Sequence, residues 1–110
     1  MDALKRGDLV TVALQGDQGK PRPALVVQSD HFAALPGVTV LPITSTLLDA
    51  PLLRVDIEPS LQNGLAKRSQ IMVDKPQTLH RSKVGGVIGH LEQSTLLTVN
   101  GALALFFGLG

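Results

Sequence analysis

Hydrophobic and polar residues alternate along several short runs of the chain, a pattern typical of β-strands with one buried face. The clearest run is LLRVDIE, residues 52–58, in which every second residue is aliphatic. A second run extends from Leu9 to Leu14, follows Gly7 and Asp8, and alternates in the same way. Both runs therefore predict half-buried strands.

Further strands are predicted where apolar runs follow turn-forming residues. They cover Ala24–Gln28, Val38–Thr44 and SQIMVD, residues 69–74. The glycine-rich run KVGGVIGHL, residues 83–91, predicts a strand that bends or lies close to another backbone. Pro42 cannot donate to a sheet ladder, so we expect its strand to lie at an edge or to carry a bulge.

The last part of the chain has a different period. From Glu92 onward, large apolar residues recur at helical spacing, at Leu96, Val99, Leu103 and Phe106 or Phe107. This spacing predicts a terminal helix, with Ser94 near its start and Gly108 near its end.

Strands that recur about every ten residues, with turn residues between them, favour a barrel or a sandwich. We expect a mainly β fold, a small and strongly curved antiparallel β-barrel with a C-terminal α-helix. The chain has 110 residues, no internal repeat and no linker-like change of composition. One domain over residues 1–110 is therefore expected.

Composition excludes several kinds of site. The chain has no cysteine, which excludes disulfides, thiolate nucleophiles and cysteine-based zinc sites. Its aromatic residues are three phenylalanines, so tryptophan and tyrosine are not available for base stacking. No run reaches the roughly 18 apolar residues of a membrane span, and the N-terminus lacks the apolar core of a signal peptide. A cytoplasmic protein without a membrane partner is expected.

The formal net charge is +1, but the charges are unevenly distributed. Between Gly64 and Val84, Asp74 is the one acidic residue, and His80 lies in the same segment. Five basic residues accompany them: Lys67, Arg68, Lys75, Arg81 and Lys83. This basic segment predicts a surface that faces a polyanion.

The histidines His31, His80 and His90 are widely spaced and have no clustered carboxylates beside them, so no metal site is expected. They are interpreted as polar surface residues, with a general acid and base pair as the alternative use. Neither a phosphate-binding glycine loop nor a GxSxG nucleophile motif occurs. No cofactor is predicted.

Arg22 stands between Pro21 and Pro23, directly before an apolar run. Burying a guanidinium is costly, so we expect Arg22 at the edge of its strand, where a rigid and permanently charged fork suits an anion. The polar cluster Thr44, Ser45 and Thr46 follows a different strand. Each feature alone is ordinary, since a strand-edge arginine is usually a surface residue and a polar triplet is usually a turn.

Five sequence blocks together carry a resemblance: KRGDLVTVAL (5–14), RPALVVQSD (22–30), VLPITS (40–45), IMVDKPQTL (71–79) and VIGHL (87–91). In this order and spacing they resemble the MazF/PemK family of toxin endoribonucleases over nearly the full chain. The resemblance implies an SH3-like barrel that forms a homodimer and is held inactive by a cognate antitoxin. It also implies cleavage of single-stranded RNA without a metal, by attack of the RNA's own 2′-hydroxyl.

The resemblance implies roles for individual residues as well. Arg22 and Thr44 match the catalytic arginine and threonine of the family, and Ser45 and Asp74 match positions that help to bind RNA in some members. The polar cluster and the basic segment add four expected RNA-binding residues: Thr46, Lys67, Arg68 and Lys75.

Two features depart from the family pattern. The loop from Gln15 to Lys20 is shorter than usual and lacks the typical acidic and glutamine residues, which affects base selection. Met72 stands where some members carry a second basic residue. The residue that acts as general base stays open, with Arg22 or a histidine as the candidates.

Two other functions fit parts of the sequence. A toxin of the CcdB-like fold would bind DNA gyrase through its terminal helix, and the apolar tail LALFFGLG could form such an interface. A peptide-binding SH3-like module would need an aromatic groove, which a chain without tryptophan or tyrosine does not build easily. The presence of both Arg22 and Thr44 favours the nuclease.

Overall fold

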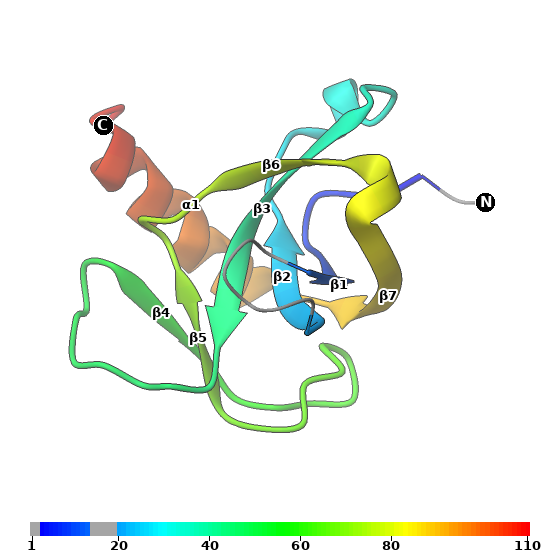
Figure 1. Cartoon of the computed structure of the whole chain (residues 1–110). Helices are drawn as coiled ribbons and strands as arrows, with labels where there is room; N and C mark the ends of the chain where they lie inside the picture. The colour runs from blue at the N-terminus through cyan, green and yellow to red at the C-terminus, as the bar shows by residue number, and fades with distance from the viewer. Residues whose placement is uncertain (1–2, 14–19) are drawn as a thin grey trace.

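The computed structural model describes residues 3–13 and 20–110, so Leu14 and most of the loop from Gln15 to Lys20 lie outside the described residues. Seven strands, two short 3-10 helices and one α-helix follow one another (Figure 1). Their bounds are β1 (Asp8–Val12), β2 (Arg22–Val26), η1 (Asp30–Phe32), β3 (Gly37–Thr44), β4 (Arg54–Ile57), β5 (Ser69–Met72), β6 (Gln77–His80), η2 (Arg81–Lys83), β7 (Val84–His90) and α1 (Gln93–Phe107).

The strands form one curved antiparallel sheet in the order β4-β5-β3-β2-β1-β7, and β6 also pairs with β3. β4 and β7 end this order and are not paired with each other in the described part of the chain, so hydrogen bonds do not close the barrel. The predicted fold class, a mainly antiparallel β structure with one C-terminal helix, is confirmed.

β3 lies in the centre of the sheet, so the prediction that Pro42 marks an edge strand is wrong. β2 pairs along one side of β3, while β6 pairs with residues 37–40 and β5 with residues 43–44 on the other side. The Val27 amide donates to the Thr39 carbonyl at 3.1 Å, and the alternation of antiparallel pairs then turns the Pro42 nitrogen away from β2. On the other side of β3, Pro42 lies between the residues that pair with β6 and those that pair with β5. Neither pairing therefore requires the amide hydrogen that proline lacks.

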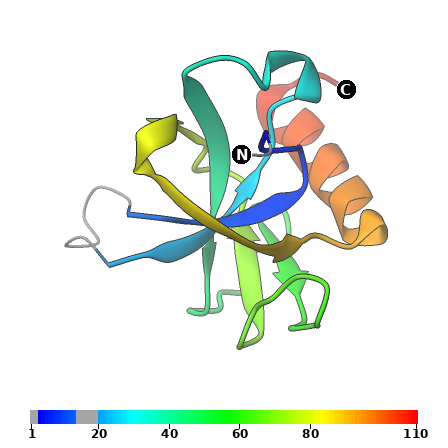
Figure 2. The ribbon, with the colours of Figure 1, turned by 90° about the vertical axis from the view of Figure 1, so that its right-hand side faces the viewer.

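The two faces of the central strands bury separate hydrophobic cores. Leu25 and Leu41 point to the first core, which α1 covers through the fully buried Val99. Ala24 and Val40 point to the second core, which Leu79 of β6 and Val84 of β7 help to cover. Figure 2 shows α1 along one side of the sheet and the η2 turn on the opposite side.

The terminal helix agrees in part with its predicted periodicity. Val99 is buried and Leu96 and Leu103 pack against the first core, but Phe106 and Phe107 are exposed. The helix ends at Gly108, whose left-handed backbone (φ 72°) favours glycine, as predicted. Glu92 rather than Ser94 precedes its first turn.

No helix among the described residues is long and apolar enough to cross a membrane.

Strand β6 was not predicted from the sequence. Its residues QTLH contain a single apolar side chain, Leu79, and follow Pro76, so the segment has no strand-like alternation. Pairing with the first half of β3 holds it in the sheet.

The Glu92 carboxylate joins the start of α1 to the turn after β4. Ser60 Oγ donates to Glu92 Oε2 at 2.5 Å, and Nδ2 of the buried Asn63 donates to Glu92 Oε1 at 3.2 Å. The bond from Ser60 is the main cause that lowers the pKa of Glu92 from its ordinary value of 4.5, and burial opposes it.

The lowered pKa predicts how acid affects stability. The contribution of Glu92 is complete above its ordinary value of 4.5 and is lost as the pH falls through the lower pKa of the folded state. Glu92→Gln should therefore reduce the free energy of unfolding at neutral pH and flatten its acid dependence. Urea unfolding between about pH 7 and about pH 3 measures both effects. Asp49→Asn, at an exposed position, is the control, and an unchanged acid dependence in Glu92→Gln would contradict the assignment.

Candidate functional site

A cleft of ≈ 350 Å³ opens at the end of the sheet where β3 ends and β2 and β5 begin, the lower end in Figure 1. Three segments of the chain line it: the start of β2, the end of β3 with the residues after it, and the segment that leads into β5. The lining residues are Arg22, Pro23, Pro42, Ile43, Thr44, Ser45, Thr46, Leu65, Ala66, Lys67, Ser69 and Met72.

The pairing of β2 with β3 brings Arg22 and Thr44 to the same cleft. The pairing of the two strands ends at Ala24 and Pro42, and Arg22 and Thr44 each lie two residues beyond that pair. Both residues line the cleft. Arg22 is exposed and is the first residue of β2, as expected for its guanidinium.

A hydrogen bond within the turn after β3 orients the hydroxyl of Thr44. The Thr46 amide donates to Thr44 Oγ1 at 3.0 Å. A hydroxyl has one donor and two acceptor sites, so accepting this bond leaves its proton to donate elsewhere. The local turn thus prepares Thr44 as a hydrogen-bond donor toward the cleft.

The described residues that line the cleft give it a positive charge. Arg22 and Lys67 are the charged residues among them, and none of them is a carboxylate. Met72 adds an apolar wall to the cleft. The family resemblance indicates that some members carry a second basic residue at this position. A positive cleft with a hydroxyl at its edge suits a phosphate group.

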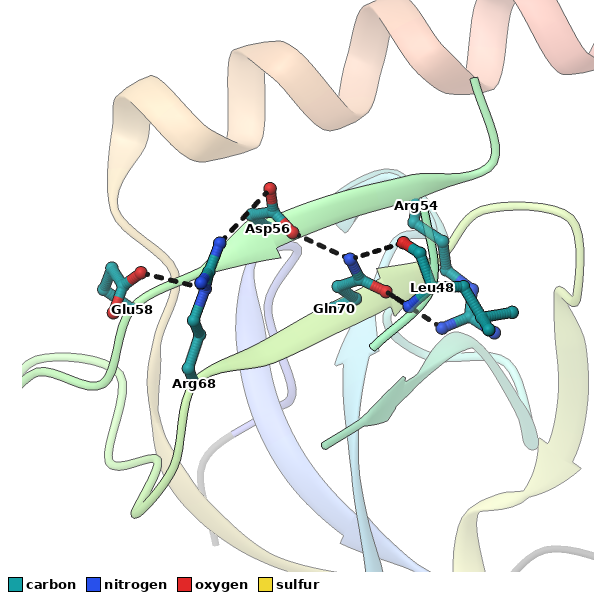
Figure 3. Close-up of polar contacts among 6 residues, drawn as sticks. All are labelled: Leu48, Arg54, Asp56, Glu58, Arg68 and Gln70. Carbon is teal, nitrogen blue, oxygen red and sulfur yellow. Dashed lines mark hydrogen bonds and ion pairs between the residues drawn. The ribbon is translucent and has the colours of Figure 1, made fainter. Parts of the chain in front are cut away.

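The basic segment does not form one continuous surface around the cleft. Arg68 Nε lies 3.2 Å from Glu58 Oε1, and its Nη2 lies 4.0 Å from Asp56 Oδ2 (Figure 3). Arg81 Nη2 donates to the carbonyls of Ala33 at 2.5 Å and Leu35 at 3.3 Å, which fixes the connection between β2 and β3.

Asp74 and Lys75 follow the end of β5, beyond Met72, the last residue of the strand that lines the cleft. The Lys75 Nζ atom is 3.6 Å from Asp74 Oδ2, in an ion pair between neighbours. Of the expected site residues, the cleft brings together Arg22, Thr44, Ser45, Thr46 and Lys67; its lining does not include Arg68, Asp74 or Lys75.

The three histidines do not contribute to this cleft. His31 and His80 are exposed beside η1 and η2, and His90 Nδ1 lies 2.7 Å from Oδ1 of the buried Asp8. Among the residues that the structure describes, no group of three His, Asp or Glu side chains is placed to hold a metal ion.

Sequence reasoning missed two residues that shape the site. Ser69 is buried, lines the cleft, and donates from Oγ to the Lys67 carbonyl at 2.9 Å. Gln70, also buried, bonds the backbone that follows Thr44. The sequence offered one indication of these two residues, because they form a polar pair at the start of a predicted strand. Their position beside the cleft follows only from the pairing of β5 with β3, in which Gln70 lies opposite Thr44.

A model of the PemK-like, MazF-like toxins of type II toxin-antitoxin systems matches residues 5–107. The chain belongs to this toxin family. The resemblance drawn from the five sequence blocks is thereby confirmed.

Individual relatives agree with the family assignment. The chain is 42% identical over 107 residues to the probable endoribonuclease MazF of Mycolicibacterium smegmatis, a match that covers 96% of this chain and 98% of that protein. A mycobacterial endoribonuclease solved in complex with its cognate antitoxin superposes with a TM-score of 0.84, at 25% identity and 98% coverage of both chains. The Mycobacterium tuberculosis toxin MazF-mt6 gives a TM-score of 0.80 at 27% identity, over 94% of this chain and 98% of that one. The MazF relationship does not favour the CcdB-like alternative.

Proposed function

We propose that this MazF-family chain is an endoribonuclease that cleaves single-stranded RNA by attack of the RNA's own 2′-hydroxyl. The observation that supports the proposal is the cleft whose described lining includes Arg22, Thr44 and Lys67 and no carboxylate. The similarity to the probable endoribonuclease MazF supports it.

In the proposed reaction, the 2′-oxygen attacks the neighbouring phosphorus and the bond from phosphorus to the 5′-oxygen breaks. The 2′-oxygen passes its proton to solvent water, the departing 5′-oxygen takes a proton from solvent water, and a 2′,3′-cyclic phosphate remains. The step needs alignment of the attacking oxygen and stabilisation of charge on the two non-bridging oxygens.

Arg22 and Thr44 supply that stabilisation. The planar guanidinium of Arg22 can donate two parallel hydrogen bonds to the phosphate oxygens, a geometry that a lysine does not reproduce. The Thr44 hydroxyl, already bonded by the Thr46 amide, donates a hydrogen bond to the same phosphate oxygens. A permanent cation and a neutral donor together can stabilise this charge without a metal ion.

The remaining cleft residues bind the RNA on either side of the reacting phosphate. Lys67 provides a second cation, and Ser45 and Thr46 provide polar groups at its rim. Arg68, Asp74 and Lys75 lie outside the cleft lining. In the proposed complex they contact RNA that extends beyond the cleft.

The proposed partners are a cognate antitoxin and a second copy of the chain, acting in the cytoplasm where mRNA is translated. The mycobacterial structural neighbour was solved with its antitoxin. Leu105, Phe106 and Phe107 expose apolar surface on α1 that such partners can cover.

Substitution of Arg22 tests the proposal. Purified protein should cleave single-stranded RNA in EDTA and leave a cyclic phosphate end. Arg22→Ala should lower the single-turnover rate by at least about 100-fold because it removes the main charge stabilisation, and Arg22→Lys should not restore it. Mass spectrometry of the fragments and circular dichroism of each variant are the measurements, with Lys83→Ala as the control. Cleavage by Arg22→Ala at the normal rate would contradict the proposal, and intact RNA beside inhibited gyrase would favour the CcdB-like function.

Lys67 and Arg68 offer a comparison of adjacent cations. Lys67→Ala should weaken binding of a 2′-deoxy substrate analogue and reduce the slope of affinity against salt by about one, because one fewer phosphate is neutralised. Arg68→Ala should have a smaller effect, since its guanidinium already pairs with Glu58 and Asp56. Fluorescence anisotropy over a salt series measures both, and equal slopes for the two variants would refute this difference.

A further inference from the structure

We infer that Gln70 is a positioning residue for the cleavage step, acting through the backbone of the segment 45–49 on the hydroxyl of Thr44. The inference rests on the proposed function of the cleft. Gln70 belongs to β5 and does not itself line the cleft.

The side-chain amide of Gln70 uses all four of its hydrogen-bonding sites. Its Nε2 donates to the Leu48 carbonyl at 3.0 Å and to Asp56 Oδ1 at 2.9 Å. Its Oε1 accepts from the Leu48 amide and from Arg54 Nη1, each at 3.0 Å (Figure 3). The neighbours also fix the orientation of the amide, because an ionised Asp56 can only accept and Arg54 can only donate.

Arg54 extends the same network toward the active threonine. Its Nη1 also donates to the Thr46 carbonyl at 3.1 Å. Gln70 and Arg54 thus hold the peptide groups on both sides of residue 47. The peptide just before them carries the Thr46 amide, which bonds Thr44 Oγ1.

Packing does not hold this segment in place. All residues from 45 to 49 are exposed, and Leu47 and Leu48 leave 41% and 55% of their surface in solvent, whereas Gln70 is only 6% exposed. Hydrogen bonds from Gln70 and Arg54 to main-chain groups therefore restrain this segment. A loosened segment would misdirect the Thr44 hydroxyl, and small misplacements of a catalytic donor can cost about 100-fold in rate.

The test compares two glutamines whose side chains bond the backbone of a connecting segment, Gln70 after β3 and Gln28 before β3. Gln70→Met removes all four hydrogen bonds of the Gln70 side chain and keeps the side-chain length. Gln28→Met is the matched control, because Gln28 accepts from the Thr39 amide at 2.9 Å and donates to the Phe32 carbonyl at 3.4 Å, at the other end of β3. Single-turnover cleavage rates, affinity for a 2′-deoxy substrate analogue and the thermal midpoint are measured for each variant.

Gln70→Met should lose about 10- to 100-fold in cleavage rate, while its affinity for the analogue changes by less than about threefold. Gln28→Met should lower the thermal midpoint and keep the rate within about threefold of wild type. A Gln70→Met variant that cleaves at the wild-type rate, or equal rate losses in both variants, overturns the inference. The proposed function fails separately, if Arg22→Ala remains active.

Gln70→Glu keeps the inference testable if Gln70→Met does not fold. The introduced carboxylate would face the Leu48 carbonyl and Asp56 where the amide now donates, with Arg54 on its other side. Gln70→Glu should therefore cleave at least about 10-fold more slowly than wild type, while its affinity for the 2′-deoxy analogue changes by less than about threefold. Cleavage at the wild-type rate would overturn the inference.

Discussion

The pairing of β2 with β3 is the interaction on which the rest of the structure depends. Its register places Leu25 and Leu41 in the core beneath α1 and turns Ala24 and Val40 to the opposite core. A shift by one residue would exchange the two faces of a strand. The same pairing leads Arg22 and Thr44 into one cleft, so the hydrophobic pattern that fixes the fold also brings the proposed catalytic side chains together.

Two polar side chains are buried beside the end of β3. Ser69 and Gln70 are buried at the start of β5, where apolar residues would pack without any hydrogen-bonding requirement. The side chain of Gln70 bonds the amide and the carbonyl of Leu48. Its other two bonds are to the charged residues Arg54 and Asp56 of β4. Buried amides are costly when unsatisfied and rigid when fully bonded. Here a fully bonded amide restrains an exposed segment that has little apolar contact of its own.

Much of the fold was predictable because it follows from local patterns. Alternation identified β1 and β4, apolar runs after turn residues identified β2, β3 and β5, and a glycine-rich run identified β7. The glycine after the terminal helix marked its end. Pro42 was misjudged because its environment depends on two different neighbouring strands meeting along one side of β3. β6 was missed because only its partner β3 makes it a strand.

The candidate site was likewise predictable only in part. Arg22 and Thr44 could be singled out because each ends or begins an apolar run, and the family resemblance linked them. The roles of Arg68 and Gln70 could not be predicted. Arg68 looked like part of a basic surface until the strand pairing brought Asp56 and Glu58 beside it. Gln70 occupied a polar position of an alternating run, and its partners lie 14 to 22 residues away along the chain.

Gln70 and Arg54 contact the segment after Thr44 through peptide groups rather than through side chains. The shape of this segment is therefore independent of which side chains it carries at positions 45, 47, 48 and 49. Side chains at these positions can therefore be exchanged without rebuilding the support beneath. The segment keeps its path through its main-chain atoms, which leaves its side chains available to change.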